Sequence, residues 1–472
     1  MFTFQVFVVG ISLTGFGVIS TVNDYLSYPV MTKVSVREED NVDFPAVTIC
    51  NLNRVNCENL RAAIQGRQYS NYTEKLCKIL ILGECIDSGA VARFREASEC
   101  QNVGPAVAND DEAEMMFGES YNGLPSSLRV RIGHRMRDTI VRCRMNGKAC
   151  DLRREFRSFS SFKYGTCFSF NDYLVKSRIK VGRAGPSFGL ELELFLDATS
   201  HLGGGLSPAS GFRVGIAQQD SPVDLENVGV NLEPGKLTSL GLKMRELSRL
   251  ADPYPSDCHH SWDTLLGGIG MTEATPVPES LGDIRYTNLY CQRVCLLVQT
   301  KRRCDCYNTD LDVNPAGFLD RPGLRICSKM NASDTECTGG LFEETSTCPQ
   351  CHAACREMFY ERVVSTAVWP AERNLEHYAN DARVAGYGDG GGDRRAWVRR
   401  EFSRVEIYLD GKEVTKIEEE ALITSKNLVT SLGGALSLFL GMSFVTLMEV
   451  AELTAEVLFS LFPRWLAVKT AK

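Results

Sequence analysis

Two apolar segments without charged residues, one at each end of the chain, constrain the fold more than any other feature. Residues 1–23 contain no Asp, Glu, Lys or Arg, and a second uncharged segment, residues 427–448, follows Lys426. A helix needs about 20 such residues to cross a bilayer. No basic residue precedes the first segment and no small-residue cleavage site follows it, which favours a transmembrane helix over a signal peptide. We therefore expect spans at residues 1–23 and 427–463, with a short cytosolic tail at 464–472.

The 18 cysteines all lie between Cys50 and Cys355, in the long segment that separates the two apolar ends. A high cysteine content in an even number is typical of disulfide-bonded proteins that fold in an oxidising compartment. The same segment contains two N-glycosylation sequons, at Asn71 and Asn331. Residues 24–426 are therefore expected to form an extracellular domain, with both termini of the chain in the cytosol.

Composition excludes several classes of protein. Of the 472 residues, 44% are hydrophobic, which is enough for a sizeable core and argues against disorder. The formal net charge of -7 disfavours nucleic acid as a partner, because phosphate binding requires a clustered basic surface. The sequence contains no GxSxG, HExxH or Walker motif, and its 6 histidines show no catalytic grouping. We therefore expect neither an enzyme nor a bound cofactor.

Strand and loop patterns are visible in the long segment. Apolar and polar residues alternate at residues 190–194 and again at 405–409, which indicates two strands with one buried face each. A glycine cluster at residues 386–392 predicts a surface loop. Its formal GxGxxG pattern lacks the flanking strand and helix of a dinucleotide site, so we assign it no function.

The later cysteines are spaced as on helices. Cys291 and Cys295 are four residues apart, and Cys348, Cys351 and Cys355 follow at three and four, which would place each group on one face of a helix. Two such helices could be joined in antiparallel order, with Cys291–Cys351 and Cys295–Cys348, or equally well in parallel order. A zinc site in the Cys-Pro-Gln-Cys-His sequence is a competing interpretation, which an oxidising compartment disfavours. We expect no metal.

A series of sequence blocks spans nearly the whole chain. They are Phe44-Pro45-Ala46-Val47-Thr48-Ile49-Cys50-Asn51, Gly165-Thr166-Cys167-Phe168-Ser169-Phe170-Asn171, Gly211-Phe212-Arg213-Val214, Cys304-Asp305-Cys306, Trp369-Pro370 and Gly441-Met442-Ser443. In this order, between two apolar segments, they resemble the degenerin, epithelial sodium channel and acid-sensing ion channel family. The resemblance implies an α+β membrane protein whose two transmembrane helices flank a disulfide-rich ectodomain of palm, β-ball, finger, thumb and knuckle, with the thumb near residues 258–360. It also implies a trimer in the plasma membrane, homomeric or with related subunits, that conducts sodium and is blocked by amiloride.

The disulfide pattern of that family, carried over to this sequence, implies seven bonds. They are Cys50–Cys167, Cys143–Cys150, Cys258–Cys355, Cys291–Cys351, Cys295–Cys348, Cys304–Cys337 and Cys306–Cys327. The resemblance thus implies the antiparallel order for the cysteines expected on helices. Four cysteines remain, namely Cys57, Cys77, Cys85 and Cys100, and we expect them to pair with one another in the finger.

The resemblance places the pore in the second apolar segment. The implied pore and selectivity residues are Gly433, Gly434, Leu438, Gly441, Met442, Ser443, Glu449 and Glu452. Glycine allows three backbones to approach an axis, and a helix break at Gly441-Met442-Ser443 would turn carbonyl groups toward a lumen that sodium crosses. Three copies of Glu449 would form an anionic ring, since an acidic side chain in lipid is costly unless it faces water. The alternatives are glycines that only pack helices in lipid and glutamates that merely flank the membrane.

The resemblance also assigns gating residues near the membrane border. Tyr28 matches a family aromatic that contacts the thumb, and Tyr254 stands where the family has its Trp partner. Thr430 and Ser431 match the position of a small residue whose enlargement holds degenerin channels open. The family has a cytosolic His-Gly motif upstream of its first span. Since this sequence begins within that span, either a preceding segment is missing or the gate is altered.

Two other functions stay open at this point. An ATP-gated trimeric channel would share the two spans, but its basic nucleotide-binding blocks are absent from this sequence. A non-conducting or regulatory receptor subunit with the same fold is the second, because Met442 replaces the small residue usual within the family's Gly-x-Ser. The extra cysteines from Cys57 to Cys100 resemble the peptide-gated branch and imply an extracellular peptide as the stimulus. The acidic residues at 110–114 do not by themselves indicate proton sensing.

Overall fold

The two alternating segments form neighbouring strands of the largest sheet. In the computed structural model of the chain, β9 (Leu190–Phe195) pairs antiparallel with β14 (Phe402–Ala421). Val405 stands opposite Leu192, and both side chains are fully buried. Because successive side chains of a strand point to opposite faces, the apolar residues of both strands share the face that joins the core. The strand predictions at both positions are confirmed.

The structure describes residues 2–85, 100, 109–172, 178–262, 284–313, 319–320, 323–343, 348–381, 383 and 394–469. These residues divide into two compact units. The large unit comprises Val34–Arg249 and Cys258–Ile417, and contains every cysteine. The helical unit comprises Met1–Lys33, Leu250–Asp257 and Glu418–Lys472. The glycine cluster predicted to form a surface loop lies outside the described residues.

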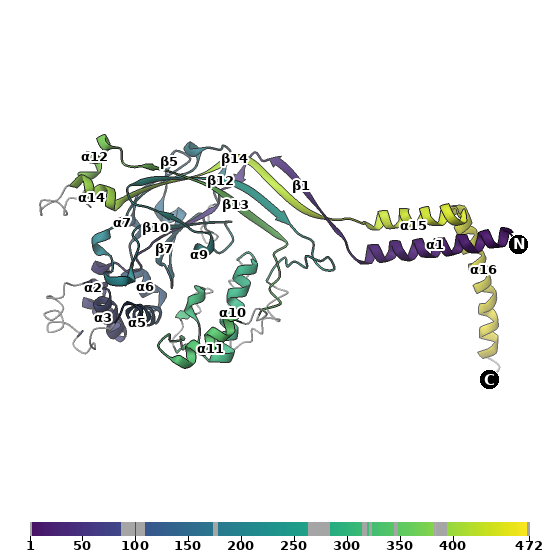
Figure 1. Cartoon of the computed structure of the whole chain (residues 1–472), viewed down its shortest axis with the longest axis horizontal. Coiled ribbons are helices and arrows are strands. Elements are labelled where there is room, and N and C mark those ends of the chain that lie inside the picture. Colours follow the sequence, from purple (N-terminus) through teal and green to yellow (C-terminus); the bar gives the residue numbers. More distant parts are fainter. Residues whose placement is uncertain are drawn as a thin grey trace. The chain divides into compact units, whose positions relative to one another are not determined.

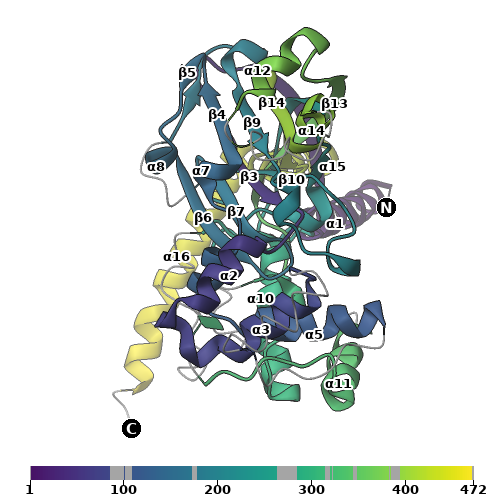
Figure 2. The same ribbon diagram turned by 90° about the vertical axis from the view of Figure 1, so that its left-hand side faces the viewer.

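Two sheets lie at the centre of the large unit (Figures 1 and 2). The first has the order β13 (Arg356–Val368), β12 (Lys236–Ser248), β14, β9, β4 (Ile140–Met145) and β5 (Lys148–Ala149), and β1 (Val30–Glu38) also pairs with β14. The second has the order β11 (Val230–Leu232), β10 (Phe212–Ala217), β3 (Ala46–Asn51), β7 (Gly165–Phe170) and β6 (Phe156–Ser161). A short pair joins β2 (Val42–Asp43) to β8 (Lys180–Val181). Both sheets contribute to one apolar core, with Ile49 and Phe168 from the second and Leu192 and Leu240 from the first.

Helices gather around these sheets in separate groups. The groups are α2 (Cys57–Gln65), α3 (Thr73–Leu82), α5 (Asp110–Asn122) and α6 (Ser126–Ile132); α10 (Asn288–Cys304) and α11 (Ala332–Glu343); and α12 (Leu375–Ala379) and α14 (Arg394–Glu401). The single-turn helices are α7 (Met136–Thr139), α8 (Leu152–Glu155) and α9 (Leu225–Val228). Figures 1 and 2 show α12 and α14 on the opposite side of the sheets from α2, α3 and α5.

Polar side chains cap the N-termini of several of the longer helices. Asn56 accepts a hydrogen bond from the backbone N–H of Asn59 at the start of α2, and Thr287 serves α10 in the same way. Asn109 caps α5, and three acidic residues follow in the first turn of that helix. Negative charge is favourable at a helix N-terminus because the peptide dipoles leave it partly positive. The acidic residues at 110–114 thus have a structural role in starting α5.

All 18 cysteines are bonded. The structure contains each of the seven pairs that the family resemblance implies: Cys50–Cys167, Cys143–Cys150, Cys258–Cys355, Cys291–Cys351, Cys295–Cys348, Cys304–Cys337 and Cys306–Cys327. The remaining four cysteines pair with one another as Cys57–Cys85 and Cys77–Cys100. These two bonds lie in the helical group of α2 and α3, because Cys57 begins α2 and Cys77 lies on α3.

The helical interpretation of the last three cysteines is wrong. Cys291 and Cys295 lie on α10 as expected. Cys348 and Cys351 instead form a turn, closed by a 3.1 Å hydrogen bond from the N–H of Cys351 to the carbonyl of Cys348, and Cys355 directly precedes β13. The sulfurs of Cys291 and Cys295 lie one turn apart on α10. Their partner cysteines need only lie at a similar spacing, and a turn provides that spacing as well as a helix does. The zinc interpretation is also wrong, since both sulfurs of this turn are in disulfides.

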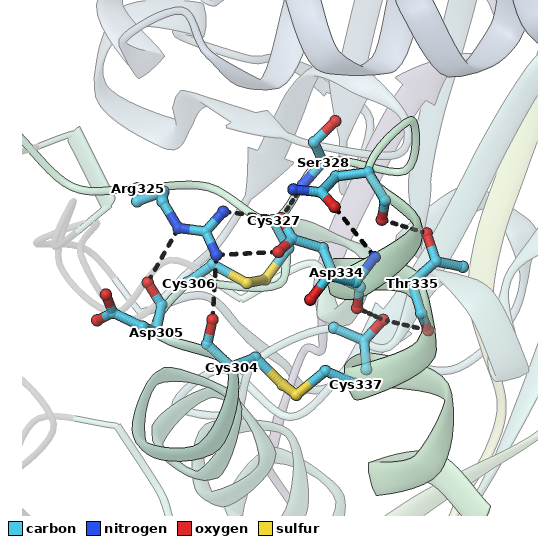
Figure 3. Close-up of polar contacts among 12 residues, drawn as sticks. Cys304, Asp305, Cys306, Arg325, Cys327, Ser328, Asp334, Thr335 and Cys337 are labelled. Atoms are coloured by element: carbon cyan, nitrogen blue, oxygen red, sulfur yellow. Dashed lines mark hydrogen bonds and ion pairs between the residues drawn. A yellow bond between two sulfur atoms is a disulfide. The ribbon is translucent and has the colours of Figure 1, made fainter.

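A salt bridge lies beside the two disulfides at the C-terminal end of α10, Cys304–Cys337 and Cys306–Cys327 (Figure 3). The guanidinium of Arg325 donates to both carboxylate oxygens of Asp334, each at 2.9 Å, and to the carbonyl of Cys304 at 3.1 Å. Asp334 also accepts from the backbone N–H of Ser328 at 2.9 Å. The hydrogen bonds from Arg325 hold the pKa of Asp334 below its usual range. A carboxylate whose pKa is lowered by folding stabilises the folded state as long as it is charged. The stability contributed by the Arg325–Asp334 salt bridge is therefore present above about pH 4 and is lost as the pH falls further.

Both glycosylation sequons lie on the surface. Asn71 is exposed in the short helix η1 (Arg67–Tyr72). Asn331 is exposed directly before α11, and its side-chain oxygen accepts from the backbone N–H of Ser333 at 3.0 Å. The amide nitrogen that would carry a glycan is a different atom from this acceptor. Glycosylation of both residues stays a prediction that their exposure permits.

Gly165→Ala is expected to destabilise the protein more than Gly147→Ala. Both glycines have positive φ, +75° and +73°, but a Cβ at Gly165 would lie 2.5 Å from the carbonyl oxygen of Arg54, whereas the space at Gly147 is open. Substitution at Gly147 should cost about 1 kcal/mol of backbone strain. At Gly165 the clash should raise the total to about 3 kcal/mol. The melting temperatures of the two full-length variants in detergent measure the difference, and equal shifts would contradict it.

Candidate functional site

Three helices form most of the helical unit and occupy the two apolar segments. They are α1 (Phe2–Leu26), α15 (Ser425–Leu440) and α16 (Phe444–Lys469). Their bounds differ from the predicted spans, because α1 continues past Asp24 and the second apolar segment forms two helices. Among the helices that the structure describes, none combines enough length with enough apolar character to cross a bilayer.

Small residues of α1 allow it to pack closely against α15 (Figure 1). A Cβ on Gly10 would lie 2.8 Å from the carbonyl oxygen of Phe439, and a Cβ on Gly17 would lie 3.8 Å from the Cβ of Ala435. Small side chains let two apolar helices bring their backbones close together. The glycine pair 433–434 has open space around both positions. Within one chain, the helix-packing role considered for that pair therefore belongs to Gly10 and Gly17.

The Gly-Met-Ser sequence breaks the second apolar segment. Gly441 follows α15 in the left-handed conformation, with φ 64°, and donates from its N–H to the carbonyl of Ser437 at 3.0 Å. Ser443 then precedes α16, and its Oγ accepts from the backbone N–H of Thr446 at 3.3 Å. A left-handed glycine ends helices and a serine at the N-cap starts them, so the break follows from local sequence. Figure 1 shows the chain changing direction between α15 and α16.

Most of the other pore residues implied by the resemblance, and the gating residues of the second apolar segment, are exposed on α15 and α16. Thr430 and Ser431 are exposed near the start of α15, and Leu438 near its end is 78% exposed. Met442 is half-buried in the break. The acidic residues Glu449 and Glu452 are exposed on α16. Exposure of large apolar side chains such as Leu438 indicates a surface that another molecule covers.

Tyr28 contacts Tyr254 at the end of α1. The ring centroids are 5.5 Å apart and the rings meet edge to face, at an interplanar angle of 76°. Tyr28 is the second residue after the end of α1 and has a positive φ of 48°. Such aromatic pairs stabilise by about 0.5–1.5 kcal/mol beyond the area they bury. The structure thus brings together the two residues that the resemblance pairs, with Tyr254 in the place of the family's Trp.

Sequence reasoning missed Glu419, which hydrogen-bonds to residues on either side of Tyr254 in the chain. Glu419, near the end of β14, accepts hydrogen bonds from the backbone N–H of Leu250 at 3.1 Å and from the Oγ of Ser256 at 2.6 Å. The available signal was the acidic run at 418–420, shortly before the second apolar segment. A run of charged residues is usually a solvated face. The hydrogen-bond partners of Glu419 lie more than 150 residues away in the chain, and no sequence pattern indicates them.

Comparison with known proteins identifies the class. A family model described as "Amiloride-sensitive sodium channel" matches residues 2–453. The chain therefore belongs to the amiloride-sensitive sodium channel family, a family of ion channels and not of enzymes.

Individual relatives are distant but similar over most of the chain. Degenerin unc-8 of Caenorhabditis elegans is 26% identical over 367 residues, which cover 76% of this chain and 44% of that protein. Degenerin-like protein asic-1 of the same species is 24% identical over 395 residues, or 79% and 44%. Epithelial sodium channel subunit gamma-2 of Xenopus laevis is 25% identical over 342 residues, or 70% and 48%. The chain thus spans less than half the length of these relatives.

Removing both local signals at the break should join α15 and α16 into one helix. In the double variant Gly441→Ala and Ser443→Ala, the left-handed stop and the N-cap are lost. Spin labels at Leu438 and Leu453, both exposed, should then move apart toward about 22 Å, the length of continuous helix between them. Gly434→Ala, at a position with open space in α15, is the matched control and should leave the distance unchanged. A distance of about 22 Å already in the unmodified chain would contradict the break.

Proposed function

We propose that the chain is one subunit of a trimeric, sodium-selective and amiloride-sensitive cation channel of the plasma membrane, gated through its extracellular domain. Its assembly would use identical or related subunits, with α1 and α15–α16 in contact with membrane lipid and both termini in the cytosol. The observation that carries this proposal is the helix break at Gly441-Met442-Ser443, flanked by glycines 433–434 with open space around them. Membership of the sodium channel family supports it.

The break provides what a cation needs in order to cross lipid. An ion in a narrow pore requires oxygen atoms that replace its water, and non-helical backbone is tolerated at membrane depth only where it lines a cavity. Gly441 and the pair at 433–434 carry no side chain, so three copies can bring their backbones close to one axis. Apolar Leu438, 78% exposed in one chain, would be covered in the assembly by lipid or by another copy.

The acidic residues of α16 support cation over anion transport. Glu449 and Glu452 are exposed in one chain, and a carboxylate at membrane depth normally faces water or a partner. Three copies of Glu449 around an axis would raise the local cation concentration at the cytosolic mouth of the pore. Glu452, almost one turn further on, would extend this acidic surface.

A peptide is the proposed extracellular stimulus. Its support is the pair of bonds Cys57–Cys85 and Cys77–Cys100, which lie in the helical group of α2 and α3 and add to the seven bonds implied by the family as a whole. A non-conducting or regulatory subunit is the second candidate function. Met442, half-buried at the break, favours it, because a long side chain there narrows any shared path.

The experiment is expression of the full native reading frame in oocytes, with current measured in sodium and with amiloride added. Glu449→Lys should lower the cation current about tenfold or more, because three lysines would repel the ion that three glutamates attract. Glu413→Lys makes the same charge change at an exposed position of β14 and should leave the current unchanged. Unchanged current and selectivity in Glu449→Lys would remove the anionic ring. A surface-expressed wild type without current would favour the non-conducting subunit.

Enlarging Thr430 should hold the channel open. A phenylalanine at this exposed position of α15 would hinder the close approach of neighbouring copies that a closed pore requires. Thr430→Phe is expected to give a standing amiloride-blocked current about fivefold above wild type per surface channel. Val429→Phe, at the neighbouring position that is 69% exposed, is the control and should change the current much less. Equal effects of the two variants would argue against a specific role for Thr430.

A further inference from the structure

A short loop connects the disulfide-bonded region to the contacts beside α1. The loop is Leu250–Asp257, and the residues on either side of it are held at one point. The N–H of Arg249 donates to the carbonyl of Cys355 at 2.8 Å, and Cys258 is disulfide-bonded to the same Cys355. The loop is therefore closed at its base by a covalent bond and a hydrogen bond. We call residues 250–257 the strap.

The strap itself belongs to the helical unit, together with α1, α15 and the end of β14. On one side, Tyr254 meets Tyr28 edge to face at the end of α1. On the other side, one carboxylate oxygen of Glu419, Oε2, accepts both from the N–H of Leu250 at 3.1 Å and from the Oγ of Ser256 at 2.6 Å. A single side chain on β14 thus holds both the beginning and the end of the strap.

Glu419 lies near the end of β14, the strand that is followed in the chain by α15, the proposed pore helix. After β14, Thr424 caps α15 by accepting from the N–H of Asn427 at 3.2 Å. The N–H of Leu422 also donates to the carbonyl of Pro29 at 2.8 Å, which ties the end of β14 to the end of α1. The chain just after α1 and the chain just after β14 are therefore joined to each other here, and the strap contacts Tyr28 on the first side and Glu419 on the second.

Strand geometry separates Glu419 from its acidic neighbours. Successive side chains alternate between the two faces of a strand, so Glu418 and Glu420 point away from the face that Glu419 uses. Glu420 instead forms an ion pair with Lys33 at 2.8 Å. Of the acidic run at 418–420, Glu419 is the residue whose hydrogen bonds reach the strap.

We propose that Glu419 is a positioning residue for gating: it clamps the strap to the end of β14, so that movement of the strap reaches α15 as well as α1. This inference rests on the proposed channel function. A carboxylate suits the role because hydrogen bonds to a charged acceptor are about twice as strong as neutral ones. Tyr28 and Tyr254 alone would couple the strap only to α1, whereas Glu419 extends the coupling to the helix that contains the break.

The first test measures the clamp without any current. In the purified full chain, hydrogen exchange at the N–H of Leu250 should be about tenfold faster in Glu419→Ala, since its acceptor is lost. Glu418→Ala, the neighbouring acid on the other face, is the matched control and should leave this rate unchanged. The N–H of Arg249, bonded to Cys355, is an internal reference that should stay protected in both variants. Unchanged exchange at Leu250 in Glu419→Ala would overturn the clamp.

The second test measures gating, normalised to the amount of protein at the cell surface. Glu419→Ala and Ser256→Ala should each lower the amiloride-blocked current about fivefold, and the double variant should be no worse than either. Glu419→Gln, which keeps a carbonyl oxygen as acceptor, should restore at least half of the loss. In the Thr430→Phe background, where α15 is held open directly, Glu419→Ala should have no effect.

These outcomes separate the proposal from simple misfolding and from failure of the proposed function. Loss of current in Glu419→Ala that persists in the Thr430→Phe background would indicate a structural defect and overturn the gating role. Faster exchange at Leu250 with unchanged current would overturn it as well. A wild type that carries no current would remove the proposed function and its gating, while the exchange comparison would still decide whether Glu419 holds the strap.

Discussion

The hydrogen-bonded pairing of one long strand, β14, is the constraint on which the rest of the structure depends. It pairs with β12, β9 and β1, so its backbone groups are satisfied by neighbours on both sides. Its first half contributes Val405 and Ile407 to the main core, and its last residues include Glu419. A strand with both edges paired cannot slip by one residue without turning its whole apolar set to the wrong face. The strand whose first half contributes to the core thus also carries Glu419, which hydrogen-bonds to the strap.

Several of the disulfides stabilise helical groups that the main core does not reach. The sheets share one large apolar core, but the helical groups around α3 and α10 have smaller cores of their own, and cysteines are part of each. A bond of this kind stabilises by about 2–4 kcal/mol, mainly by restricting the unfolded chain. Bonds therefore matter most where little apolar surface is buried. The Cys258–Cys355 bond has a further consequence, because it closes the base of the strap.

The proposed pore and the proposed gating contact at the strap depend on opposite physical properties. At the break, glycine and serine remove side-chain bulk and interrupt the helix, so the backbone itself becomes available to an ion. At the strap, an aromatic pair and a carboxylate supply directional contacts that hold a loop in one place. The first requires space and the second requires close contact.

The sequence alone determined the elements that depend on local preferences. Alternation at 190–194 and 405–409 predicted both central strands, because this signal acts within a few residues of backbone. The break at Gly441-Met442-Ser443 was expected from the family resemblance, and the structure adds the left-handed glycine and the serine N-cap that produce it locally. The seven implied disulfides came from family resemblance, since cysteine spacing fitted both orders of pairing and wrongly indicated a helix at Cys348. Only the tertiary structure decided that Gly10 and Gly17, and not the pair at 433–434, pack α1 against α15. Only it joined Glu419 to the strap, because a hydrogen bond between residues so far apart in the chain depends on how the strands pair and leaves no periodic trace in the sequence.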